Sequence, residues 1–230
     1  MTGVAGQRPG ARRAPVEVEA KLLVPQAATL RALARLRQIG PYVLRPRRRV
    51  RPHSLYLDTA DLALAQRGVA LRLRRHGRQW EATAKWRGRV RGFMHQRPEL
   101  SLPLRGTPRM PFVLPAGPLA DRLAGLVGTQ PLVPILITEI RRRLFDVFVE
   151  GGGTRPVAEM VLDSVRLSVP SRLRPRHECY DELEIELAHG TRRDVLRLAR
   201  LLQARFDLPT SSDSKFARGL ALLHRRVLRG

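Results

Sequence analysis

Several segments of the chain alternate polar and apolar residues with the two-residue period of a β-strand. In the first segment Glu17, Glu19 and Lys21 share one face, while Val18 and Ala20 fall on the other. On a lone strand such charges would ordinarily face solvent. The same alternation recurs along the chain, however, with charges that would neutralise one another if they faced a common interior. The pattern therefore predicts an antiparallel sheet with one charged face.

About eight segments follow this pattern. Beyond the first, the charged sets in strand phase are Arg72 and Arg74; Glu81 and Lys85; Arg97 and Glu99; Arg141 and Arg143; Glu159 and Asp163; and Glu182, Glu184 and Glu186. Buried like charges are costly unless a ligand or metal lies between them. We therefore expect an α+β fold: an eight-stranded antiparallel β-barrel, or tunnel, with a charged interior and helices packed outside.

The remaining segments are predicted to be helices, loops and a tail. Helical periodicity predicts helices from Pro25 to about Gln38, at 61–66, at 119–127, at 191–206 and from Ser214 to about Val227. We interpret the arginine run at 45–51 as a solvated loop, and 103–118 and 170–177 as connections. Residues 1–15 are rich in Gly, Pro and Arg, which predicts a disordered basic tail before a single domain at 16–228.

Composition narrows the partners and the compartment. The 230 residues carry a formal charge of +23, which favours a polyanion: nucleic acid, polyphosphate, a phosphorylated small molecule or an acidic membrane surface. The single cysteine, Cys179, excludes an intrachain disulfide and favours a reducing compartment. The sequence contains no apolar run long enough for a membrane span, and residues 1–15 lack the apolar core of a signal peptide. We expect a cytoplasmic protein without a membrane partner.

The basic residues are almost all arginines. Lys21, Lys85 and Lys215 are the only lysines among 43 basic residues, and a compact ammonium suits a crowded phosphate site better than a guanidinium fork does. Cations in strand phase would bind phosphate oxygens, while paired carboxylates suit hard divalent ions that bridge those oxygens. Neither the cations alone nor the carboxylates alone would be sufficient for such a site.

The ordered segments resemble the CYTH domain, or triphosphate tunnel metalloenzyme, family. Its hallmark Glu-x-Glu-x-Lys strand is matched by residues 17–21. The resemblance continues in order through 56–59 (YLDT), 71–74 (LRLR), the strand of Lys85, 97–99 (RPE), 159–163 (EMVLD), 182–186 (ELEIE) and 214–219 (SKFARG). It spans about residues 16–223, and all three lysines fall within its motifs.

This resemblance implies a tunnel that hydrolyses or cyclises triphosphates with Mg²⁺ or Mn²⁺, and it assigns roles to individual residues. The implied metal ligands are Glu17, Glu19, Glu184 and Glu186. The implied phosphate-binding residues are Lys21, Arg72, Arg74, Lys85, Arg97, Arg141, Arg143 and Lys215. Glu99, Glu159 and Asp163 are further acidic groups, and with Lys85 they form the expected catalytic set. We expect activated water to attack a terminal phosphorus.

Several alternatives stay open at this point. The motifs resemble bacterial inorganic triphosphatases more than thiamine-triphosphate or RNA-capping members, and no nucleoside or thiamine pocket is identifiable for an adenylyl cyclase or an organic-triphosphate hydrolase. A non-catalytic polyphosphate- or RNA-binding module is the alternative that the basic charge suggests. Many bacterial relatives carry a CHAD domain; this chain is too short for one, so we expect any such domain to be a partner in trans.

Other polar residues have alternative or structural interpretations. Glu81 and Glu182 fit either the interior or ordinary strand charges, and the six histidines have no ligand spacing, so we interpret them as surface or structural. Tyr56 and Asp58 are expected to shape the end of a strand.

Overall fold

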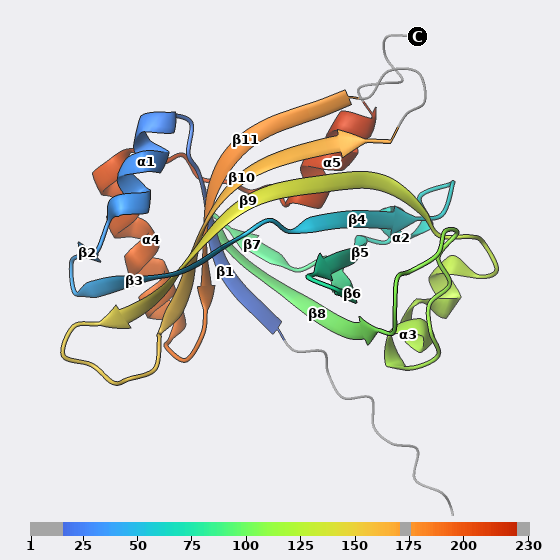
Figure 1. Ribbon diagram of the computed structural model, residues 1–230, viewed down its shortest axis with the longest axis horizontal. Helices are drawn as coiled ribbons and strands as arrows, with labels where there is room; N and C mark the ends of the chain where they lie inside the picture. The colour runs from blue at the N-terminus through green and yellow to red at the C-terminus, as the bar shows by residue number, and fades with distance from the viewer. Residues whose placement is uncertain (1–15, 171–175, 225–230) are drawn as a thin grey trace, which may run out of the picture.

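A closed barrel of eight antiparallel strands forms the centre of the computed structural model, which describes residues 16–170 and 176–224 (Figure 1). In barrel order the strands are β1 (Val16–Leu23), β8 (Met94–Leu104), β6 (Gln79–Trp86), β5 (Val69–His76), β4 (His53–Asp58), β9 (Val133–Val149), β10 (Ala158–Val169) and β11 (Arg176–Leu187). Pairing of β11 with β1 closes the ring. The predicted barrel is confirmed, whereas the predicted tail at 1–15 lies outside the described residues.

The register places the charged residues of neighbouring strands side by side. Glu19 of β1 lies opposite Glu186, and Lys21 lies opposite Glu184, both on β11. The alternate residues Ala20 and Leu22 are fully buried in the apolar layer outside the barrel. This register places the first strand beside the 182–186 strand, with both sets of carboxylates on the interior face.

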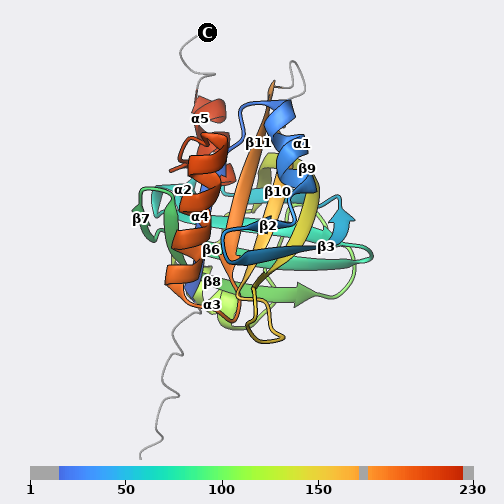
Figure 2. The same cartoon turned by 90° about the vertical axis from the view of Figure 1, so that its left-hand side faces the viewer.

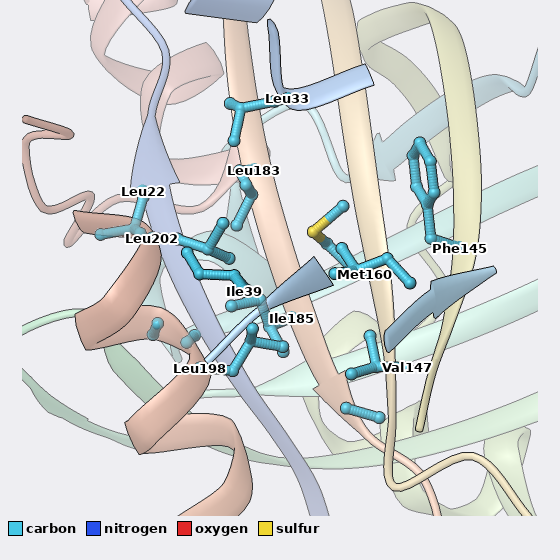
Figure 3. Packing of buried hydrophobic residues seen from close by; sticks show 14 of the residues in the cluster. Leu22, Leu33, Ile39, Phe145, Val147, Met160, Leu183, Ile185, Leu198 and Leu202 are labelled. Carbon is cyan, nitrogen blue, oxygen red and sulfur yellow. The ribbon is translucent and has the colours of Figure 1, made fainter. Parts of the chain in front are cut away.

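One apolar layer covers the outside of β1, β10 and β11. It is formed by α1 (Ala27–Arg35) and α4 (Arg192–Phe206), which stand side by side against the barrel (Figure 2). Leu33 of α1 and Leu198 and Leu202 of α4 pack with Leu22 and Ile185 of the sheet (Figure 3). Burial of these alternating apolar residues under helices turns the charged face of each strand inward.

A second apolar layer covers the outside of β5, β6 and β8. It includes α2 (Ala63–Gln66) and α3 (Pro118–Val127), with Leu71 and Leu73 of β5 packed beneath them. Buried Asp58 accepts hydrogen bonds from the backbone N–H groups of Leu64 and Ala65, at 2.9 Å each. Asp58 therefore shapes the end of β4, as its sequence position predicts.

The last helix, α5 (Lys215–His224), packs against the inner face of the barrel at one end. Its Phe216 and Leu222 contact an apolar cluster that includes Ile140, Val165 and Leu167, which point inward from β9 and β10. The segment before α5 is held by a backbone hydrogen bond from Ser211 to the carbonyl of Lys21. The interior is therefore apolar at this end and charged in the middle.

Three further strands extend the sheet: β2 (Gln38–Ile39), β3 (Tyr42–Val50) and β7 (Arg89–Arg91). The prediction of a loop at 45–51 is wrong, because residues 45–50 belong to β3. This strand pairs with β9 over residues 142–149, next to the stretch at 133–139 that pairs with β4. The long β9 thus offers an edge on which the arginine run satisfies its backbone hydrogen bonds.

No helix in the described part of the chain has the length and apolar character needed to cross a membrane.

Candidate active site

A cavity of about 340 Å³ occupies the middle of the tunnel. Its lining combines carboxylates and cations from β1, β5, β6, β8, β9, β11 and α5. The acidic members are Glu17, Glu19, Glu81, Glu99, Glu184 and Glu186, and the basic members are Lys21, Arg72, Arg74, Lys85, Arg97, Arg142 and Lys215. The volume lies at the lower end of the range for small-molecule sites. A lining of both signs suits a compact anion that binds together with a cation.

Three of the strands hold a network of ion pairs on one side of the cavity. Lys85 Nζ of β6 lies 2.6 Å from Glu17 Oε1 of β1 and 2.9 Å from Glu99 Oε2 of β8. Arg97 Nη2 of β8 lies 2.5 Å from Glu19 Oε1. Because each of these cations already contacts carboxylates, the network fixes the side chains in place before any ligand binds.

A buried acidic cluster lies beneath the cavity. Asp163, Glu182 and Glu184 each offer a carboxylate oxygen within 4.8 Å of the others. The ammonium of Lys215 contacts all three, at 3.0 Å from Asp163 and 3.1 Å from Glu184, with Glu182 also in close contact. Burial alone would raise the pKa of Glu184, but Lys21, Lys215 and Arg142 together hold it well below its ordinary value. Lys215 therefore acts here as a built-in cation that anchors α5.

Two arginines of β5 lack such compensation. Within the described residues, neither Arg72 nor Arg74 has a carboxylate within 4 Å. Arg74 Nε donates only to Ser54 Oγ, at 3.3 Å, and the buried Nε of Arg72 has no hydrogen-bond partner. Burial, together with the nearby charges of Arg72 and Arg142, lowers the pKa of Arg74 to about 9. This wall of the tunnel therefore presents positive charge that an anion would stabilise.

Glu186 lies on the opposite side of the cavity and is a carboxylate that lacks a compensating cation among the described residues. It opens to the solvent in the tunnel and forms no ion pair within 4 Å among the described residues. Enclosure by the tunnel walls, with the charges of Glu17, Glu19 and Glu159, raises the pKa of Glu186 to about 7. Each carboxylate has about four lone-pair sites, so the ion pairs of its neighbours leave acceptor capacity. The donor set around Glu186 thus fits a hard divalent cation.

The prediction that Arg141 and Arg143 face the tunnel is wrong. Arg142 points into the tunnel, where its Nε and Nη2 atoms donate to buried Asp163 at 2.8 and 2.7 Å. Arg141 and Arg143 are exposed on the outer side. The reversal follows from α5, which packs on Ile140 and so turns the apolar residues of this stretch inward. The tunnel cation supplied by β9 is therefore Arg142.

Two of the predicted acidic residues do not line the cavity. Asp163 is fully buried between Arg142 and Lys215. Glu159 lies away from the cavity lining and pairs with Arg47 Nη1 of β3 at 2.5 Å. Glu17, Glu19, Lys21, Arg72, Arg74, Lys85, Arg97, Glu99, Glu184, Glu186 and Lys215 do line it, and their individual roles stay predictions.

Sequence reasoning missed three polar residues that the structure places inside the barrel or at its mouth. The sequence pattern assigns Arg141 and Arg143, and not Arg142, to the interior, places Arg47 in a loop and leaves Glu182 undecided. His95 is 1% exposed, and its Nε2 lies 2.9 Å from the carbonyl oxygen of Ser211, which is consistent with a structural role. The in-phase position of Glu182 with Glu184 and Glu186 was the one signal available for it.

A closed antiparallel barrel with this charged interior defines a class of tunnel proteins whose cavity lies within the sheet. The chain belongs to the CYTH domain family, whose profile matches residues 16–220. It is 27% identical over 178 residues to an inorganic triphosphatase of Haemophilus influenzae. That match covers 75% of this chain and 46% of the relative, so the chain spans about half the length of this curated relative.

Solved structures share the fold at low sequence identity. HpAC1 from Hippeastrum, described as having a dominant triphosphatase activity, superposes with a TM-score of 0.64 at 18% identity, covering 89% of this chain and 95% of that one. A Bacillus halodurans protein described as a candidate adenylate cyclase gives a TM-score of 0.56 at 17% identity, with 86% and 93% coverage. Protein PH1819 of Pyrococcus horikoshii gives 0.53 at 14% identity, with 88% and 98% coverage. These similarities establish the fold.

Proposed function

We propose that this protein hydrolyses inorganic triphosphate to pyrophosphate and phosphate inside the tunnel. The observation that carries the proposal is the separation of uncompensated charge across one cavity. Among the described residues, Arg72 and Arg74 have no anionic partner and Glu186 has no cationic partner within 4 Å. A triphosphate together with a divalent cation would supply both. The inorganic triphosphatase relative from Haemophilus influenzae supports this choice of substrate.

The carboxylates of β1 and β11 are the groups that would hold the cation. Glu17, Glu19, Glu184 and Glu186 lie on adjacent strands, with Glu19 directly opposite Glu186. Oxygen donors of this kind suit Mg²⁺ or Mn²⁺, which when bound would neutralise phosphate charge and activate water.

Arg72, Arg74 and Arg142 would bind the phosphate oxygens and orient the chain of phosphates. Guanidinium groups suit this role because they donate two parallel hydrogen bonds to an oxyanion. Lys85, held between Glu17 and Glu99, would neutralise charge that develops on the leaving group. Phosphoryl transfer depends on such positioning and charge stabilisation more than on a covalent catalyst.

Hydrolysis forms one bond and breaks another at the terminal phosphorus. The oxygen of a water molecule bonds to that phosphorus, the bridging P–O bond breaks, and pyrophosphate departs with the bonding electron pair. The proton lost by the water passes to a carboxylate. Among the three further acidic residues expected from the sequence, only Glu99 lines the cavity, where it keeps partial access to solvent. We therefore assign proton acceptance to the carboxylate of Glu99.

The activity is tested by measuring phosphate release from inorganic triphosphate, ATP and thiamine triphosphate, with Mg²⁺ or Mn²⁺ in separate series. We expect inorganic triphosphate to have the highest kcat/KM. Absence of phosphate release from all three would exclude the hydrolase. Formation of cyclic AMP from ATP would instead favour a cyclase.

A double variant separates a catalyst from a module that only binds polyanions. Glu17→Gln with Glu19→Gln removes two carboxylates from the cavity but preserves side-chain size. A catalyst should lose turnover, whereas a binder should keep or gain affinity for triphosphate because the site becomes more positive. Glu99→Gln should lower kcat with little effect on KM, because it removes the proton acceptor and leaves the phosphate-binding arginines intact.

A further inference from the structure

The arginines on the outside of the barrel form a second basic site. Arg141 and Arg143 point outward from β9, and Arg49 of β3 lies directly opposite Arg143 in the register. Arg31 of α1 and Arg51, which follows β3, complete the set. All five side chains line one hollow of about 480 Å³ between α1 and the outer face of β3 and β9, which we name the outer arginine groove.

No acidic residue balances this charge. The lining of the outer arginine groove contains no Asp or Glu, and none of its five exposed arginines forms an ion pair within 4 Å among the described residues. Arg49 and Arg143 are cross-strand neighbours, and like charges directly opposite each other in a sheet are unfavourable. The folded protein alone therefore gains nothing from this arrangement, whereas an anion bound across the strands would relieve the repulsion.

The groove is separate from the tunnel. Arg142, which lies between Arg141 and Arg143 in the sequence, also borders the groove, but its guanidinium group pairs with Asp163 inside the barrel. The same stretch of β9 therefore presents arginines to both faces of the sheet. A ligand in the groove would lie on the other side of the sheet from the tunnel cavity.

The lining also indicates which kind of polyanion fits. Proteins that bind single-stranded nucleic acids stack bases on aromatic side chains. The outer arginine groove has no aromatic lining residue, and its other members include Leu30, Ala34 and Ser164. A chain of phosphates without bases satisfies the guanidinium groups and leaves no base surface without a partner.

The groove continues beyond these residues. Arg51, Arg141 and Ser164 also line a neighbouring hollow of about 670 Å³, which is formed by residues 51–53, 139–141, 164–166 and 179–181. That second hollow contains Glu139 and Asp181 beside Arg166, so it is less favourable to an anion. An extended ligand is therefore expected to place its phosphates along the acid-free part, between α1 and β9.

We propose that the outer arginine groove is a docking site for linear inorganic polyphosphate, distinct from the tunnel. Binding there would hold a long polyphosphate against the barrel wall and raise its local concentration near the tunnel mouths. The site does not depend on hydrolysis, so it stands or fails separately from the proposed triphosphatase activity.

The test uses the full chain and two variants that lose the same charge. The groove variant carries Arg31→Ser, Arg49→Ser and Arg51→Ser. The control carries Arg89→Ser, Arg91→Ser and Arg193→Ser, which lie in another arginine-lined hollow between β7 and α4. Binding of long-chain polyphosphate and of poly(U) RNA is measured by filter binding in EDTA, over a series of salt concentrations, to prevent metal-dependent hydrolysis.

We expect the groove variant to bind polyphosphate about tenfold or more weakly, and its salt slope to fall by about 2, as expected for three lost phosphate contacts. The control variant should change far less, and both should hydrolyse inorganic triphosphate as the wild type does. Equal losses in the two variants would overturn the proposal in favour of non-specific attraction. A larger loss of poly(U) than of polyphosphate binding in the groove variant would show a nucleic-acid site instead.

A matched set of lysine substitutions controls for loss of the folded structure. Arg31→Lys, Arg49→Lys and Arg51→Lys keep the charge but remove the guanidinium fork. We expect intermediate affinity and an unchanged thermal midpoint. Wild-type affinity in the serine variant, with or without a change in stability, would contradict the assignment.

Discussion

Replacement of Lys215 by Met should destabilise the barrel strongly, because this ammonium compensates the buried acidic cluster. Asp163 and Glu182 have fully buried side chains, and that of Glu184 is 11% exposed. In the variant Asp163 keeps Arg142, and Glu184 keeps Lys21 and Arg142. Glu182 loses its only ion pair within the described residues. Breaking a buried pair in this way costs about 3 to 5 kcal/mol.

Urea unfolding at several pH values measures this cost. Burial already raises the pKa of Glu182 in the wild type, and loss of Lys215 should raise it further. A carboxyl with a raised pKa binds its proton more readily in the folded than in the unfolded chain. The folded variant should therefore recover stability as the pH falls through the range between the two pKa values. Its deficit relative to wild type should be largest near neutral pH.

Two controls make the result specific. Arg218→Met, on the same helix, removes a partly exposed pair with Glu178 and should cost about 1 kcal/mol or less. Glu182→Gln added to Lys215→Met should restore part of the stability, because it removes the uncompensated charge. A loss of less than about 1 kcal/mol in Lys215→Met, or no improvement at lower pH, would refute the interpretation of Lys215 as the compensating cation.

Three further predictions follow from the geometry. Arg142→Ser should lower kcat/KM for triphosphate by about a hundredfold, while the double variant Arg141→Ser, Arg143→Ser should leave kcat/KM unchanged. A larger loss in the double variant would contradict the conclusion that Arg142 faces the tunnel. Gly88→Ala should lower the free energy of unfolding in urea by about 1 to 3 kcal/mol, because the added Cβ would lie 1.8 Å from the backbone oxygen of Gln96. The control Gly125→Ala adds a Cβ that meets nothing within 4 Å, so it should be neutral or stabilising. Burial lowers the pKa of His95, so the unfolded chain binds a proton at this imidazole more readily and the stability of the fold should decrease below about pH 6.5. The His95→Asn variant should lose less stability on acidification. Identical pH profiles of stability for variant and wild type would disprove the contribution of His95.

The strand phase of the charged residues was predictable because period-two alternation fixes which side chains share a face. The positions of Glu17, Glu19 and Lys21 therefore led directly to an interior wall once repetition showed that a common interior was required. The prediction that Glu184 and Glu186 belong to the same metal site came from the family resemblance and not from the local pattern.

The errors arise where a distant element changes the local environment. At 139–143 the inner face carries Ile140 and Arg142, because α5, more than seventy residues later in the sequence, packs against Ile140 there. The arginine run of β3 has no alternation that predicts a strand, and it is ordered by the free edge of β9. The role of Lys215 within the acidic cluster likewise depends on where α5 enters the barrel.

Phosphate release from inorganic triphosphate by an Arg72→Ser, Arg74→Ser variant tests the tunnel most directly. These two arginines line the cavity and lack carboxylate partners among the described residues. The control, Arg75→Ser with Arg78→Ser, removes the same charge from exposed positions at the same hairpin. We predict a fall in kcat/KM of about a hundredfold or more for the first variant and little change for the control. Equal activity in the two variants would contradict hydrolysis inside the tunnel.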